Sequence, residues 1–125
     1  MSTTPVQSSD TAAADKTLNE MILSGKALDA FEQFYADDVV MQENSEEPRA
    51  GKDLNRKYEQ EFFSSLASWN DGKLVSSAVN GDTTFSEWYM DVTFKNGFQM
   101  KASQVAVRQW KNGKIVHERF FYNKG

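Results

Sequence analysis

The sequence predicts an α+β fold in which three N-terminal helices cover the concave face of a curved antiparallel sheet, giving a cone-shaped domain. Three observations support this prediction. Apolar residues recur at helical spacing before residue 70, they alternate with polar residues after it, and short segments containing Asn and Gly separate the alternating stretches. Long antiparallel strands twist and coil, so the sheet should have a hollow face that helices can cover.

The composition favours a single domain and excludes several kinds of site. The chain has 125 residues, no Cys and a formal net charge of −4, so cysteine chemistry is excluded and nucleic acid is not an expected partner. Residues 1–11 are polar and rich in Ser and Thr, which predicts a disordered tail before a domain over residues 12–125. No stretch reads as a signal peptide or a membrane span, so we expect a cytoplasmic location and no membrane partner.

Three helices are expected before residue 70. The first begins near Thr11 and ends at Ser24-Gly25, because glycine commonly terminates a helix. The second covers residues 26–36, where apolar side chains recur at helical spacing. The third covers residues 52–69, with an apolar residue at every fourth position from Leu54 to Leu66.

Strands are expected on both sides of the third helix. The first, at residues 39–43, is rich in Val and too short for a helix, and a turn-rich loop follows it. After residue 72 the pattern alternates, and the Asn-Gly pairs at residues 96–97 and 112–113 suit hairpin turns that need positive φ. The remaining strands are expected at residues 73–79, 83–94, 98–110 and 114–122.

Two segments carry a resemblance to a known family. FYADDVVMQENSEEPRAG, residues 34–51, resembles ketosteroid isomerases and SnoaL-like polyketide cyclases of the nuclear transport factor 2 superfamily, and WKNGKIVHERFFY, residues 110–122, resembles the last hairpin of SnoaL-like proteins. The resemblance extends over residues 17–122. It implies the cone fold, a cavity for a small and largely apolar molecule, and no cofactor. One His and no Cys also predict no metal site.

Glu43 is the first candidate catalytic residue. The resemblance places the isomerase general base at Glu43, where the family has Asp, and it places the oxyanion-hole acid near Val105, which cannot donate a hydrogen bond. The first helix also lacks the expected Tyr, so steroid isomerisation is not expected. Glu43 shares a strand face with Val39 and Met41 and should point into the cavity. The alternative is an exposed carboxylate paired with Arg49 or Lys52.

The last strand offers a second acid or base, whose identity depends on register. The resemblance implies that Glu118 and Tyr122 point inward, and a shift by one residue would place His117 inward instead. An inward Glu118 gives the cavity a second carboxylate that could share acid and base roles with Glu43. The alternative is a cross-strand ion pair of Glu118 with Arg108 or Lys101.

The candidate ligand-binding residues are large side chains expected around the cavity, each of which can also serve in core packing. They are Tyr58, Phe62, Trp88, Met90 and Tyr122.

Two functions remain open from the sequence. The first is a SnoaL-like protein whose pocket holds a small, largely apolar molecule, with proton-transfer chemistry of the isomerase or cyclase type. The second is a non-catalytic ligand-binding or dimerisation module. A homodimer through the outer face of the sheet is expected in either case, because both faces of the last strands carry apolar residues. These are Val105, Val107 and Phe121 against Ala102, Ala106 and Phe120.

Overall fold

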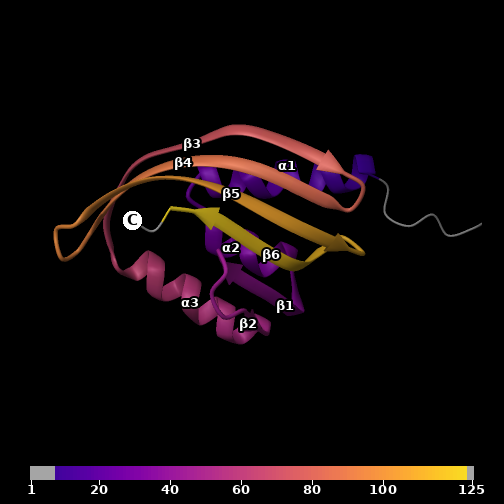
Figure 1. Cartoon of the computed structure of the whole chain (residues 1–125), viewed down its shortest axis with the longest axis horizontal. Coiled ribbons are helices and arrows are strands. Elements are labelled where there is room, and N and C mark those ends of the chain that lie inside the picture. The colour runs from indigo at the N-terminus through magenta and orange to yellow at the C-terminus, as the bar shows by residue number, and fades with distance from the viewer. Residues whose placement is uncertain (1–7, 124–125) are drawn as a thin grey trace, which may run out of the picture.

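The computed structural model describes residues 8–123 and has three helices and six strands (Figure 1). Their bounds are α1 Ser8–Leu23, α2 Ala27–Phe34, β1 Tyr35–Glu43, β2 Arg49–Ala50, α3 Lys52–Ser64, β3 Leu66–Asn80, β4 Thr83–Phe94, β5 Gln99–Lys111 and β6 Lys114–Tyr122. No helix within residues 8–123 has the length and apolar character needed to cross a membrane.

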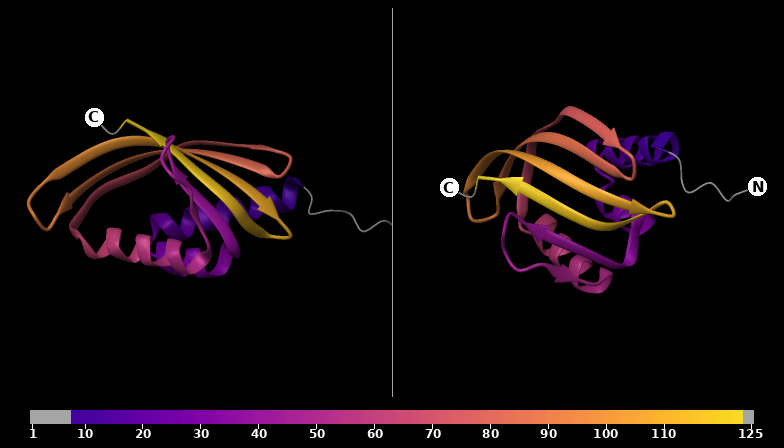
Figure 2. Two further views of the ribbon diagram at one scale, coloured as in Figure 1. Left: turned by 60° about the horizontal axis from the view of Figure 1, so that its bottom comes forward. Right: turned by 45° about the vertical axis from the view of Figure 1, so that its right-hand side comes forward.

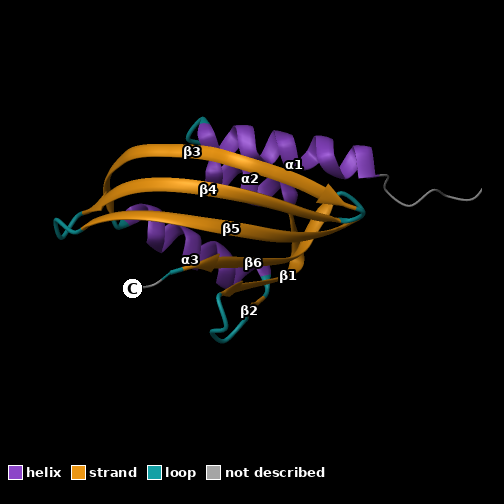
Figure 3. Ribbon diagram, turned by 45° about the horizontal axis from the view of Figure 1, so that its top comes forward, coloured by secondary structure: helices purple, strands orange, loops and turns teal. Residues whose placement is uncertain are grey.

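The sheet is curled and open, and its strand order is β2-β1-β6-β5-β4-β3. All neighbours are antiparallel except β1 and β6, which run parallel. Figure 2 (left) shows the strands arching over the three helices, which lie together on the concave side, and Figure 3 shows β3, β4 and β5 running side by side along the length of the arch. The predicted fold class is therefore confirmed, with one parallel pairing that the sequence did not predict.

The first helix begins earlier than predicted. α1 starts at Ser8 rather than near Thr11, and Asp10 lies in its first turn, where a carboxylate is stabilised by the helix dipole. Thr11 and Asp15 are buried, so the start of the helix is packed against the sheet rather than disordered. The expected tail over residues 1–11 must be shortened accordingly, and residues 1–7 lie outside the described part of the chain.

The third helix is shorter than predicted and the strand after it is longer. α3 ends at Ser64, and β3 already begins at Leu66, where the helical spacing of apolar residues had predicted a continuing helix. Trp69 pairs with Val92 across the β3–β4 ladder. Pairing with β4 overrides local helical spacing, and three register shifts in this ladder obscure the alternating pattern that would have identified the strand.

The expected strand at residues 39–43 is present but longer. β1 starts at Tyr35, directly after α2, so the second helix also ends two residues before its predicted limit. The loop that follows contains the short strand β2, in which Ala50 pairs with Val40. This hairpin brings Arg49 back beside the end of β1.

The core is concentrated at one end of the cone, where α1 and α2 meet β1 and the β5–β6 hairpin. Phe31 stacks on Tyr35 with ring centroids 4.7 Å apart, and Phe34 meets Trp110 edge to face at 5.9 Å. The buried cluster consists of Leu18, Ala30, Phe31, Phe34, Tyr35, Val39, Met41, Trp110 and Ile115. None of these buried residues lies on α3 or on the far ends of the long strands, and the side chains there surround a cavity instead.

Association through the outer face of the sheet remains a prediction. On that face Val105 lies opposite Phe121, and Phe85 lies opposite Val107. Phe121 is 42% exposed. We expect sedimentation at micromolar concentration to give twice the 14.2 kDa mass of one chain, and Phe121→Lys to give monomers with an unchanged circular dichroism spectrum. A wild-type monomer would contradict this prediction.

Candidate functional site

A cavity of about 560 Å³ lies between the helices and the concave face of the sheet. Its volume is in the range of small-molecule sites. Side chains from every helix and from β1, β3, β4, β5 and β6 line it, and most of them are apolar or aromatic. The cavity extends from the Tyr35 end of the core to Phe94 and Phe98, at the β4–β5 turn.

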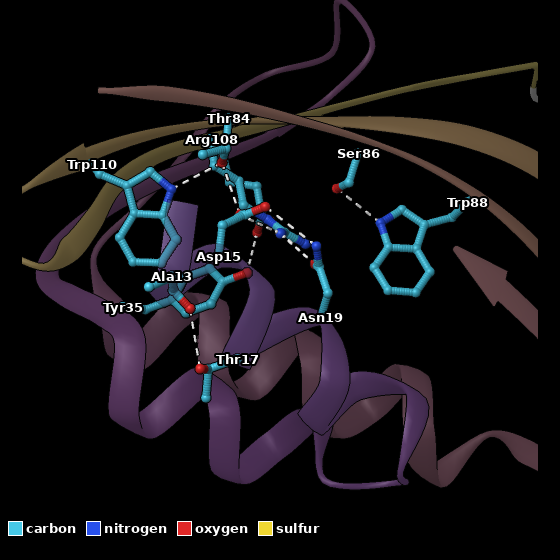
Figure 4. A network of polar contacts seen from close by, with 11 residues as sticks. Ala13, Asp15, Thr17, Asn19, Tyr35, Thr84, Ser86, Trp88, Arg108 and Trp110 are labelled. Carbon is cyan, nitrogen blue, oxygen red and sulfur yellow. Dashed lines mark hydrogen bonds and ion pairs between the residues drawn. The ribbon is translucent and has the colours of Figure 1, made fainter. Parts of the chain in front are cut away.

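The five candidate ligand-binding residues come together in this wall. Tyr58 and Phe62 reach it from α3, Trp88 and Met90 from β4, and Tyr122 from β6. The Trp88 indole N–H donates to the Ser86 hydroxyl over 3.0 Å, which fixes the plane of the ring (Figure 4). Ligand binding by these residues remains a prediction, since the shared position is also what packing around a cavity would produce.

Glu43 lies in the cavity wall and is also ion-paired, so it combines the two arrangements that the sequence left as alternatives. Its Oε2 accepts a hydrogen bond from Arg49 Nη2 over 2.8 Å, and the residue is only 9% exposed. The Arg49 guanidinium stacks over the Tyr58 ring at 3.7 Å, and Tyr122 donates to Glu43 Oε1 over 3.4 Å. The negative charge of Glu43 is therefore balanced within the wall.

The last strand places Glu118 inward and His117 outward. Glu118 is fully buried, whereas His117 lies opposite Gln109 on the outer face and does not line the cavity. A register shift next to Trp110 leaves Val116 without a partner in β5, so Ile115 also turns inward and joins the core. Because of this bulge, simple alternation along the strand assigns the wrong face to Ile115. His117 and Glu118 point to opposite faces of the sheet, so His117 does not share the cavity with Glu118.

Glu118 belongs to a buried polar network at the floor of the cavity, and Figure 4 shows its partners Arg108 and Tyr35. Arg108 Nε donates to Glu118 Oε2 over 2.7 Å, and the Tyr35 hydroxyl donates to Oε1 over 2.5 Å. Arg108 and Glu118 are 2% and 0% exposed. Burial and the neighbouring Glu118 charge raise the pKa of Tyr35 well above its ordinary value. The cross-strand pair with Arg108 that the sequence offered as an alternative for Glu118 is present.

The same guanidinium reaches across to the first helix. Arg108 Nη1 donates to Asp15 Oδ1 over 2.8 Å and to Asn19 Oδ1 over 2.7 Å. Asp15 Oδ1 also accepts from the Thr84 hydroxyl, which in turn accepts from the Trp110 indole N–H. One cation thus connects α1, β5 and β6, and the hydrogen bonds continue into β4.

Glu59 is the functional candidate that the sequence analysis missed. It lies on α3, lines the cavity and is half-buried. Within residues 8–123, no hydrogen bond or ion pair is formed by its carboxyl group. The pKa of Glu59 is raised to about 8 by burial, then by the charges of Glu118 and Glu43, and nearby Arg49 offsets part of this effect.

Helical spacing could have identified Glu59. Asn55, Glu59 and Phe62 lie four and three residues apart, so they share one helix face. Phe62 was already expected in the cavity wall. Asn55 is fully buried and its amide donates to the carbonyls of Arg49 and Gly51, which anchors this face of α3 against the chain after β1. The inward position of Glu59 was not recognised because many of the residues next to it in the sequence are charged, which is typical of an exposed helix face.

The charges around the cavity are not balanced. Asp15, Glu43 and Glu118 each bind a guanidinium, supplied by Arg49 and Arg108, while Glu59 has none. Among the described residues, no group of three potential ligands is arranged to hold a metal ion. The carboxylates and guanidinium groups of the site can support acid–base and electrostatic chemistry.

The buried position of Arg108 predicts a large loss of stability when it is removed. Arg108→Met leaves Asp15 and Glu118 buried without a cation, and we expect the free energy of unfolding to fall by about 3–5 kcal/mol in urea denaturation. Arg56 is a matched control, because it also binds two carboxylates, Glu32 and Asp53, but its side chain is 30% exposed. Arg56→Met should cost much less, and equal losses would contradict the prediction.

Glu59 predicts a distinct dependence of stability on pH. Its pKa is about 8 in the folded chain and near 4.5 in the unfolded chain, so the folded state binds more protons between these values. Stability should therefore fall as pH rises through this window, by at most about 1.4 kcal/mol per pH unit for one proton. Glu59→Gln should gain stability relative to wild type across the same window, whereas Glu61→Gln, on the exposed face of α3, should not. Parallel profiles for all three proteins would contradict this.

Comparisons with known proteins agree with the fold. The model of the SnoaL-like domain matches residues 9–122. A Mesorhizobium loti protein described as a SnoaL-like polyketide cyclase is 30% identical, with a TM-score of 0.81 over 89% of this chain and 97% of its own. No curated protein shows significant sequence similarity to this chain.

Two more distant structures share the fold. An NTF2-like protein of unknown function from Burkholderia pseudomallei is 15% identical, with a TM-score of 0.77 over 90% of each chain. An LEH-like epoxide hydrolase of M. tuberculosis is 12% identical, with a TM-score of 0.74 over 92% of this chain and 84% of its own. The family model and the similarity to the M. loti protein together show that the chain belongs to the SnoaL-like family.

Proposed function

We propose that this chain is a cofactor-independent enzyme of the isomerase or cyclase type, which moves a proton on a small, largely apolar molecule held in the cavity. Glu59 is the proposed acid and base. The observation that carries the proposal is a carboxyl group in the wall of an apolar cavity with no cation bonded to it within residues 8–123. Such a carboxyl group can gain or lose a proton near neutral pH. A carboxylate bonded to an arginine is held in its charged form, so protonating it costs more free energy.

The pKa of Glu59 suits it to work near neutral pH. A value of about 8 means that both the carboxylic acid and the carboxylate are present in useful amounts between pH 7 and pH 9. General acid–base catalysis is most effective when the pKa of the group lies close to the working pH. Glu43, which the sequence favoured as the base, is less suited because Arg49 balances its charge.

Arg108 supports the proposal as a donor to substrate oxygen. It lines the cavity floor, where Nε and Nη1 are occupied by Glu118, Asp15 and Asn19. Its Nη2 group forms no hydrogen bond with residues 8–123, so it can stabilise negative charge that develops on a substrate oxygen when Glu59 removes a proton. This donor would take the place of the two oxyanion-hole groups that the sequence lacks.

The family relationship adds support. The M. loti protein, which is 30% identical, is described as a SnoaL-like polyketide cyclase, and an enzyme of the cyclase type is what we propose here. The alternative from the sequence, a non-catalytic ligand-binding or dimerisation module, uses the same cavity and the same sheet face. Turnover that depends on Glu59 distinguishes the two.

Deprotonation of 5-nitrobenzisoxazole tests the proposal without knowledge of the natural substrate. A base removes the proton on C3, the N–O bond breaks, and the coloured phenolate is measured by absorbance. We expect the protein to accelerate this reaction above buffer, with a rate that rises as Glu59 ionises and levels off above about pH 8. Glu59→Gln should lower the rate about 100-fold.

Two further variants complete this test. Glu61→Gln makes the same change at an exposed position of the same helix and should leave the rate unchanged. No acceleration by the wild-type protein, or equal rates for wild type and Glu59→Gln, would overturn the proposal. Loss of rate in Glu43→Gln alone would return the role of base to Glu43.

A further inference from the structure

We propose that the cavity binds an organic cation, a small ammonium compound with an apolar body, with the Glu59 carboxylate as its counter-ion. Charged groups in the cavity wall, together with their ion-pair partners, carry this inference: Glu43, Glu59, Glu118 and Arg108 line the cavity, while Asp15 and Arg49 are partners outside the lining. Four carboxylates, Asp15, Glu43, Glu59 and Glu118, surround two guanidinium groups, and three of the four are bonded to them. A ligand that brings one positive charge completes the pairing.

The wall around Glu59 is suited to a cation that is poorly hydrated. Phe62 lies on the same face of α3, and Trp88 and Tyr122 line the cavity from the sheet. Aromatic faces attract cations, most strongly where water is excluded. This wall already holds one such contact, because the Arg49 guanidinium lies 3.7 Å from the centre of the Tyr58 ring.

The other titratable groups near the cavity do not supply the missing charge. Lys101 lies at the exposed end of the wall, directly opposite Asp91 on the neighbouring strand. Hydrogen bonds from Gln99 and Asn70, and then the Lys101 charge, lower the pKa of Asp91. Tyr35 and Tyr122 stay neutral near pH 8, because burial followed by the nearby Glu118 or Glu43 charge raises their pKa values. His117 lies on the outer face of the sheet and does not line the cavity.

Binding of a cation must therefore be coupled to loss of a proton. At pH 7 Glu59 carries a proton most of the time, and only its ionised form can act as a counter-ion. Binding of a permanent cation should release part of a proton at pH 7, and its affinity should fall as the pH drops below the pKa of Glu59, by about as much in total as the ionised carboxylate contributes to binding. The inference shares Glu59 with the proposed function but requires no turnover, so either can fail alone.

Choline and its neutral counterpart, 3,3-dimethylbutan-1-ol, provide a direct test. They have the same shape and differ by one positive charge. We expect titration calorimetry at pH 9 to show choline binding about ten-fold more tightly than the alcohol, with the preference disappearing at pH 6. Calorimetry at pH 7 in two buffers of different ionisation enthalpy measures the released proton.

Variants assign the effect to one residue. Glu59→Gln should abolish the preference for choline and the proton release while it retains binding of the alcohol. Glu61→Gln and His117→Gln should behave as wild type. Equal affinities for the two compounds at pH 9, no binding of choline, or a preference that survives in Glu59→Gln would overturn the inference.

Discussion

The arrangement of this domain depends on the buried guanidinium of Arg108. Its nitrogens bind Glu118 on β6 and Asp15 and Asn19 on α1, while Arg108 itself lies on β5. Removing these charges from water is costly, and the cost is offset only when every partner is held in place. The network therefore fixes both the angle of the first helix over the sheet and the register of the last two strands. Tyr35 joins it through Glu118 and links it to the apolar core.

The same network determines what chemistry remains for the cavity. Arg108 and Arg49 are ion-paired with Asp15, Glu118 and Glu43, and neither forms an ion pair with Glu59. Burial, followed by the charges of Glu118 and Glu43, consequently raises the pKa of Glu59, and the nearby Arg49 charge offsets only part of this effect. Ion pairs on one side of the cavity thus influence the protonation of a carboxyl group on the other. The two are connected through electrostatics and not through shared contacts.

Much of the fold could be predicted from the sequence because its patterns are local. Helical spacing, alternation and Asn-Gly turns identified three helices and the four consecutive strands, and the resemblance placed Glu43 and Glu118 in the wall. The strand start at Leu66 and the bulge before Glu118 could not be predicted, because both depend on pairing with another strand. The pairing of Arg108 with Asp15, 93 residues away, depends on the tertiary fold. Glu59 was missed because its sequence neighbours are polar, although its helix face was recognisable.

The strand order has a consequence for how the chain acquires its structure during synthesis. β6 inserts between β1 and β5, yet it is translated after both, so β1 and α1 leave the ribosome long before their central neighbour exists. Hairpins β3–β4 and β4–β5 can form early from local contacts, whereas the parallel β1–β6 pair closes a loop of about 80 residues between its aligned Tyr35 and Ile115. Such long-range closure is slow. Until it occurs, the edge of β1 that pairs with β6 keeps its backbone N–H and C=O groups without their strand partners.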